Sequence, residues 1–228
     1  MGEERRPRWR SRVVLLLACV IVATGLAAAS TFSGVFGART LDVEGAMRLT
    51  EGEILDRAGL RLGVNVFHLD TATVRDRLLA DPWIASAEVA RDLPSTVRVR
   101  VVERIPVGTA GAFVLAGDGT VLPGAEQSGL PAIELASGVI DEEGAASGAA
   151  VLASLRLGMR REVTGVLILG DGDIVLDIGG MQVRWGPPGD DAAKAAALDA
   201  VLRSGQGASP PTMVDVSAPA TPAVTFAR

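Results

Sequence analysis

The sequence predicts an α+β protein with an apolar N-terminal helix, a compact β-α-α-β-β domain and a second, strand-rich domain with flanking helices. Three observations support this prediction. Residues 13–29 form an apolar run without a charge. Residues 81–107 alternate between apolar and polar side chains in two adjacent stretches, which is typical of half-buried antiparallel strands. Short strand-like segments separated by glycine-containing turns recur from residue 108 onward.

The apolar run follows a short basic tail. Residues 1–12 hold five arginines against Glu3 and Glu4, a net charge of +3, whereas residues 13–228 carry 17 basic and 25 acidic side chains, a net charge of −8. A helix over residues 13–36 is long enough for a bilayer core of about 30 Å. The positive-inside rule then places residues 1–12 in the cytoplasm and the remainder outside it. We therefore expect a single-pass type II protein of the cytoplasmic (plasma) membrane, with a transmembrane helix at 13–36.

A cleaved signal peptide is the alternative interpretation of this segment. It also combines a basic start, an apolar core and small residues such as Ala27–Ala29 before Ser30. The apolar run here exceeds the usual length of about 7 to 15 residues. This favours an anchor over cleavage.

Composition excludes several functional classes. The acidic balance beyond residue 12 argues against nucleic-acid binding, which needs a basic face for phosphates. Cys19, the single cysteine, lies inside the apolar run, so the sequence predicts no disulfide, cysteine metal cluster or thiol nucleophile. Lysine occurs once while arginine, alanine and glycine are abundant, which indicates a GC-rich genome.

Residues 39–107 read as one compact domain. A strand at 41–43 precedes Thr50 and Glu53, which have the spacing of a helix capping box, and Gly59 provides the helix stop. Asp70 is placed to cap a second helix that buries Val74 and Leu78 before Pro82 ends it. An antiparallel hairpin completes the domain.

The hairpin has one apolar and one charged face. Its apolar face combines Ala87, Val89, Val97, Val99 and Val101. If the connecting loop centres near Leu93, Glu88 lies opposite Arg98, and this opposite-charge pair helps to fix the register.

Residues 108–228 are expected to form a mixed β domain with an antiparallel sheet and flanking helices. Asp118-Gly119 marks a hairpin turn. The predicted strands lie near 113–115, 120–122, 163–169, 174–178, 181–185, 213–216 and 224–226, and the predicted helices cover Val151 to Met159 and 191–203.

The sequence contains no convincing catalytic or metal site. His68, the only histidine, lies in a connector without a Ser or Cys partner nearby. Asp171-Gly172-Asp173 resembles the start of a calcium loop, but Gln182 stands where the loop needs a glutamate, so a hairpin turn is the better interpretation. We expect no enzyme activity, no cofactor and no small-molecule substrate.

Two separated motifs carry a family resemblance. Residues 43–55 read V-E-G-A-M-R-L-T-E-G-E-I-L, and residues 82–107 contain P-W-I, A-x-V-x-R, P-x-T-V and V-x-E-R-x-P-V. Together they resemble the POTRA domain of FtsQ/DivIB cell-division proteins, and residues 184–186 and 214–219 resemble features of their β domain. The resemblance covers residues 13–228 and points to a high-GC actinobacterium.

The resemblance implies a scaffold at the division septum rather than an enzyme. In this family the last strands of the β domain receive a segment of the FtsB/DivIC partner beside FtsL. A strand added at a sheet edge gains affinity from backbone hydrogen bonds and selectivity from alternate side chains. The resemblance carries this partner-binding role onto Met213, Val214, Asp215, Val216, Val224, Thr225 and Phe226.

Such a scaffold links septal proteins outside the membrane to control septal peptidoglycan synthesis. Two rivals remain: a secreted POTRA-containing binding protein behind a cleaved signal, and a transport-class POTRA protein. The second requires a long barrel, which about 120 residues cannot supply.

Overall fold

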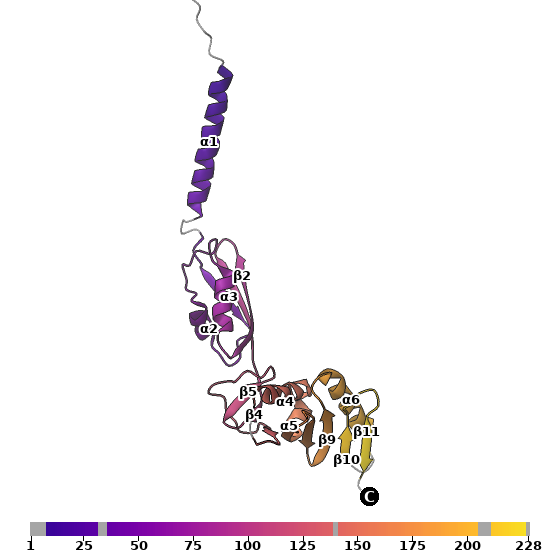
Figure 1. Cartoon of the computed structure of the whole chain (residues 1–228). Helices are drawn as coiled ribbons and strands as arrows, with labels where there is room; N and C mark the ends of the chain where they lie inside the picture. The colour runs from indigo at the N-terminus through magenta and orange to yellow at the C-terminus, as the bar shows by residue number, and fades with distance from the viewer. Residues whose placement is uncertain (1–7, 32–35, 139–140, 205–210, 227–228) are drawn as a thin grey trace, which may run out of the picture. The chain divides into compact units, whose positions relative to one another are not determined.

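The computed structural model describes residues 8–31, 36–138, 141–204 and 211–226, and the chain separates into two compact units at Glu103/Arg104. The first unit contains α1 (Arg8–Ser30), β1 (Thr40–Glu44), α2 (Glu51–Ala58), α3 (Thr71–Leu79), β2 (Ile84–Asp92) and β3 (Thr96–Glu103) (Figure 1). The unit boundary precedes residue 107 because β4 starts at Pro106 and pairs within the second sheet.

The membrane-spanning helix expected over residues 13–36 is corrected by the structure. α1 starts within the basic tail, at Arg8, and ends at Ser30, while residues 32–35 lie outside the described residues. No helix within the described residues has both the length and the apolar content to cross a membrane.

The helices of the first unit begin and end where their capping residues predict. Thr50 Oγ1 accepts from the Glu53 N–H at 3.3 Å, and Glu53 Oε2 accepts from the Thr50 N–H at 2.8 Å, which completes the capping box. Gly59 adopts the left-handed conformation at the end of α2. Asp70 caps α3 through the N–H groups of Ala72 and Thr73. The expected β-α-α-β-β order is confirmed.

The three-stranded sheet has the order β1-β3-β2, with β1 parallel and β2 antiparallel to β3. The predicted register of the hairpin is wrong by two residues. Glu88 lies opposite Arg100, while Arg98 lies opposite Ala90. The reason is that Asp92 pairs with Thr96, so the loop centres on Pro94 instead of Leu93.

The described residues of the second unit form one eight-stranded sheet with three helices. Its strands are β4 (Pro106–Ala110), β5 (Phe113–Ala116), β6 (Ala132–Leu135), β7 (Val163–Ile168), β8 (Ile174–Ile178), β9 (Met181–Gly186), β10 (Pro211–Asp215) and β11 (Ala223–Phe226). They are arranged in the order β11-β10-β9-β8-β7-β6-β4-β5. The helices are α4 (Glu142–Ser154), α5 (Leu157–Glu162) and α6 (Asp191–Ser204).

This sheet is mixed rather than antiparallel as expected. β4 and β6, β6 and β7, and β9 and β10 run parallel. The last two pairs are parallel because α4 and α5 connect β6 to β7 and α6 connects β9 to β10, and a helical crossover returns the chain to the starting end of the sheet.

The core of the second unit lies between the sheet and its helices. Trp185, Leu198, Val214 and Leu152 are fully buried there. The helix expected to continue to Met159 is interrupted at Leu155, which takes an extended conformation and buries its side chain before α5 begins.

Candidate functional site: a free strand at the edge of the second sheet

β11 forms one edge of the eight-stranded sheet. Among the described residues it pairs only with β10, in antiparallel register, with Val214 opposite Val224 and Met213 opposite Thr225. All four residues of β11 are exposed. In Figure 1 the two yellow strands lie side by side, with β11 outermost. An edge strand presents unpaired backbone N–H and C=O groups to another strand.

β10 supports this edge from inside the sheet. It pairs in parallel with β9 on one side and with β11 on the other. Val214 and Val216 are fully buried, and the Val216 N–H donates to the Arg184 carbonyl at 2.9 Å. β10 is therefore paired on both sides, whereas β11 is paired on one side only among the described residues.

A small polar cluster holds the end of β10 in place. Asp215 Oδ1 accepts from the Ser217 N–H at 2.9 Å and from the Ser217 hydroxyl at 2.6 Å. Arg184 lies 3.6 Å from Asp215 Oδ2 and donates to Asp173 at 2.8 Å. Partial burial by itself raises the pKa of Asp215, but the Ser217 hydrogen bonds and the Arg184 charge together hold this pKa below its ordinary value.

The opposite edge of the sheet is covered by its own chain. The Leu122 N–H donates to the Val114 carbonyl at 2.8 Å, and the Ala116 N–H donates to the Thr120 carbonyl at 2.9 Å. Val121 also forms an isolated antiparallel bridge with Leu115 of β5. The segment after the Asp118-Gly119 turn thus occupies the side of β5 that faces away from β4. Of the two sheet edges, β11 is the one that the described chain leaves open.

The side chains of β11 alternate between two environments. Val224 lies opposite the buried Val214 and therefore faces the helix-covered side of the sheet, as does Phe226 two residues later. They remain 36% and 49% exposed. Ala223 and Thr225 face the other side. An incoming strand would therefore meet an apolar row on one face and small or polar side chains on the other.

The seven residues expected to bind a partner thus lie in different environments of the second unit. Val224, Thr225 and Phe226 form the edge itself, while Met213 lies one strand inward with its side chain partly exposed. Asp215 belongs to the polar cluster. Val214 and Val216 belong to the core.

Arg184 joins Asp173 and Asp215, which lie 11 and 31 residues away from it in the sequence, into one cluster. The sequence indicates a hairpin turn at Asp173 and a family feature at Arg184, but not their proximity to Asp215. The strand order that brings them together is not visible in local periodicity.

Other side chains weighed from the sequence have structural partners. His68 Nε2 lies 3.0 Å from the Thr31 hydroxyl. Asp173 ends the turn between β7 and β8, where its carbonyl accepts from the Leu169 N–H, which confirms the interpretation of this segment as a hairpin turn. Within the part of the chain that the structure describes, no three His, Cys, Asp or Glu side chains are grouped so that they could hold a metal ion.

The β-α-α-β-β order of the first unit is the element order expected for a POTRA domain. Residues 36–104 match the family model described as POTRA domain, FtsQ-type. The chain is 31% identical to the cell division protein FtsQ of Streptomyces collinus over 95% of its own length and 88% of the relative's.

Two other actinobacterial relatives agree with this match. FtsQ of Mycobacteroides abscessus is 28% identical over 93% of this chain and 69% of the relative. FtsQ of Corynebacterium glutamicum is 28% identical over 90% of this chain and 96% of the relative. The chain belongs to the FtsQ family of cell-division proteins.

Proposed function

We propose that this protein is a non-enzymatic scaffold of the division septum that captures a strand of an FtsB/DivIC-type partner at β11, beside FtsL. Through this link it helps to control septal peptidoglycan synthesis. The observation that carries the proposal is the open edge of β11 in a chain of the FtsQ family.

Two features of the edge support strand addition. Because β10 is anchored by buried valines and by the Asp215 cluster, β11 is presented on a fixed neighbour. Binding of a partner strand would therefore cost this protein little conformational entropy, which favours affinity. Its backbone would pair with β11, and its alternate side chains would lie beside Val224 and Phe226.

The apolar row also predicts the chemistry of the partner strand. Burying the exposed parts of Val224 and Phe226 requires apolar side chains at alternate positions of the incoming strand. The positions between them lie beside Ala223 and Thr225 and accept small or polar residues.

The chain offers a matched pair of variants for testing this proposal. Phe226 and Phe113 are both exposed phenylalanines on edge strands, one at each end of the same sheet. We expect Phe226→Ala to weaken binding of the soluble FtsB/DivIC-type partner about ten-fold or more, as for an aromatic anchor at an interface, and Phe113→Ala to leave it unchanged. Isothermal titration calorimetry measures both. Equal affinity of the two variants would refute the proposed edge.

The septal role requires a test in cells. A fluorescent fusion of the protein should gather at division sites, and its depletion should produce elongated, undivided cells. The Phe226→Ala variant should localise to the septum but restore division poorly. A diffuse signal together with normal division after depletion would contradict the proposal.

A further inference from the structure

The three-stranded sheet of the first unit has one face that its helices do not cover. α3 packs against β2, and α2 packs against α3, on the side where Val97, Val99 and Val101 are buried. The opposite side, called the open face here, carries side chains that alternate with this apolar set. Its residues are Thr40, Asp42, Glu44, Ser86, Glu88, Ala90, Asp92, Thr96, Arg98, Arg100 and Val102.

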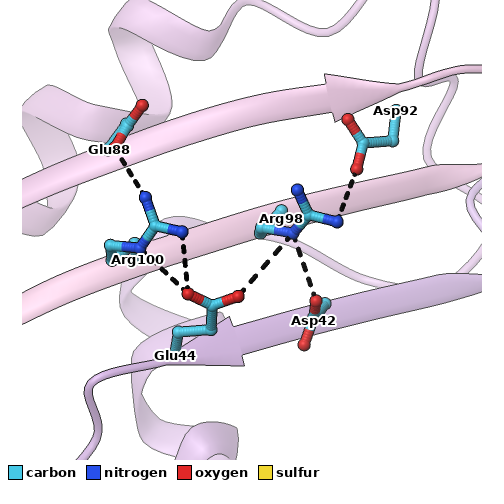
Figure 2. A network of polar contacts seen from close by, with 6 residues as sticks. All are labelled: Asp42, Glu44, Glu88, Asp92, Arg98 and Arg100. Carbon is cyan, nitrogen blue, oxygen red and sulfur yellow. Dashed lines mark hydrogen bonds and ion pairs between the residues drawn. The ribbon is translucent and has the colours of Figure 1, made fainter.

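Charged side chains on the open face form a connected network, which Figure 2 shows. Arg98 lies 2.8 Å from Asp92, 3.3 Å from Asp42 and 3.8 Å from Glu44. Arg100 lies 2.9 Å from Glu44 and 3.2 Å from Glu88. Both arginines stand on the central strand, and the carboxylates come from the strands on either side. The network therefore links all three strands.

The network has more acids than bases. Four carboxylates share two guanidinium groups, so the open face carries a net charge of −2. Residues 36–104 hold ten basic and eleven acidic side chains in total, a net charge of −1. The rest of this segment is therefore slightly positive, and its excess of negative charge is concentrated on the open face.

Register alone does not account for this excess. Two ion pairs, one from Arg98 to β1 and one from Arg100 to β2, are enough to link the three strands. The other two carboxylates, Glu44 and Asp92, share these same arginines and leave the open face with its net negative charge. Each side chain of the four acids remains 44% to 71% exposed, so an approaching cation reaches them without displacing any part of the fold.

The spacing of the four carboxylates restricts which kind of positively charged ligand can match the open face. Asp42 and Glu44 are two residues apart on β1, about 6.7 Å, and Glu88 and Asp92 flank the arginines on the other side. Basic side chains at alternate positions of an extended segment repeat at the same interval. The carboxylates are already ordered by the arginines, which lowers the entropy loss on binding. Val102, 54% exposed at one end, adds an apolar contact.

We propose that the open face of the first unit docks a segment of another protein that carries Lys or Arg at alternate positions. Charge complementarity favours this occupant: two basic side chains neutralise the net charge of −2. The site is separate from β11 and from the partner strand proposed there. The protein would thereby hold two different partners, one through backbone pairing and one through charge.

The experiment uses the full chain and a defined probe, a fluorescein-labelled acetyl-(Lys-Thr)4-amide peptide. Fluorescence anisotropy at low and physiological salt gives its affinity. The double variant Glu88→Gln/Asp92→Asn removes the excess of two negative charges from the open face. Its matched control, Asp56→Asn/Asp76→Asn, removes two exposed carboxylates from α2 and α3, on the other side of the same unit.

We expect the open-face variant to bind the peptide about five-fold or more weakly than the unaltered chain, and the control variant to bind within two-fold of it. Far-ultraviolet circular dichroism checks that both variants are folded. Equal weakening in both variants would show general attraction to an acidic protein and overturn the proposal. So would full competition by equimolar Ca²⁺, which would assign the face to a metal ion.

A charge reversal keeps the proposal testable if the double variant is unstable. Glu88→Lys should weaken binding of the (Lys-Thr)4 probe and gain binding of acetyl-(Glu-Thr)4-amide. The Phe226→Ala variant should bind the basic probe normally, because β11 takes no part in this site. Loss of probe binding in Phe226→Ala, or unchanged probe binding in Glu88→Lys, would contradict two separate sites.

Discussion

Glu103, the last residue of β3, accepts a hydrogen bond from the backbone N–H of Leu49 at 3.0 Å across a separation of 54 residues. The same carboxylate also accepts from the N–H groups of Met47 and Arg48, each at 2.9 Å. Glu103 is 8% exposed. One buried side chain therefore fixes the turn that leads into α2.

Replacing this carboxylate should loosen the turn. In Glu103→Gln, an NH2 group faces backbone donors, so we expect a loss of about 1 to 3 kcal/mol of stability in the first unit. Hydrogen–deuterium exchange should show faster exchange at residues 47–49. Asp76→Asn, which alters an exposed carboxylate of the same unit, is the control and should leave their protection unchanged. Unaltered exchange in Glu103→Gln would argue against this role.

Alanine substitutions at Gly45 and Gly63 distinguish the cost of backbone strain from the cost of a steric clash. Both have positive φ, +87° and +88°, but a Cβ atom on Gly45 would lie 2.0 Å from the Val101 carbonyl oxygen, whereas a Cβ on Gly63 meets nothing within 4 Å. We expect Gly63→Ala to cost about 1 kcal/mol and Gly45→Ala clearly more, because β1 must move away from β3. Urea unfolding followed by circular dichroism compares them. Equal losses would show that the close approach at Gly45 is relaxed.

The capping box of α2 gives a pH dependence. Hydrogen bonds from the Thr50 backbone and hydroxyl, with smaller effects of Arg57 and Arg48, lower the pKa of Glu53 below its ordinary value of 4.5. A lowered pKa in the folded state means that the stabilisation is complete above pH 4.5 and is lost as the pH falls through the folded pKa. Helix α2 should therefore fray only as the pH falls below 4.5. Amide exchange at residues 53–55 measures this.

Thr50→Ala tests the cause of that dependence. The variant should lose about 1 kcal/mol of stability at neutral pH and most of the acid sensitivity of α2. An acid response identical to that of the unaltered chain would place the sensitivity elsewhere.

Local signals predicted most of the first unit, whereas long-range arrangement was harder to predict. Thr50, Glu53, Gly59 and Asp70 act within a few residues of their own positions, so their caps follow from spacing. The pairing of Glu88 with Arg100 depends on where the hairpin loop closes, and alternation fixes that only to within two residues. The charged and apolar faces are the same in either register.

In the second sheet, too, local elements could be predicted from the sequence but their long-range arrangement could not. Its strands and helices have clear local signals, but parallel pairing follows from helical crossovers, and the open edge follows from the order of all eight strands. The family resemblance carried the partner-binding role onto Val214 and Val216. They are buried because their side chains belong to the core between the sheet and its helices.

The cluster around Asp215 should control how firmly β11 is presented. Because its pKa is lowered in the folded state, Asp215 stabilises the cluster at neutral pH and stops doing so only as the pH falls through that lowered value. Asp215→Asn should leave the second unit folded but raise amide exchange across 223–226 and weaken partner binding. Asp177→Asn on β8, two strands away from β10, is the control. Partner binding reduced equally in both variants would contradict a specific role for Asp215.

Amide exchange of residues 223–226 with and without an FtsB/DivIC-type partner segment tests the central claim most directly. Strand addition predicts strong new protection at these residues and unchanged exchange at residues 113–116 of the opposite edge. Protection at residues 113–116 or on the first unit, with exchange at 223–226 unaffected, would contradict the assignment of β11 as the partner-binding edge.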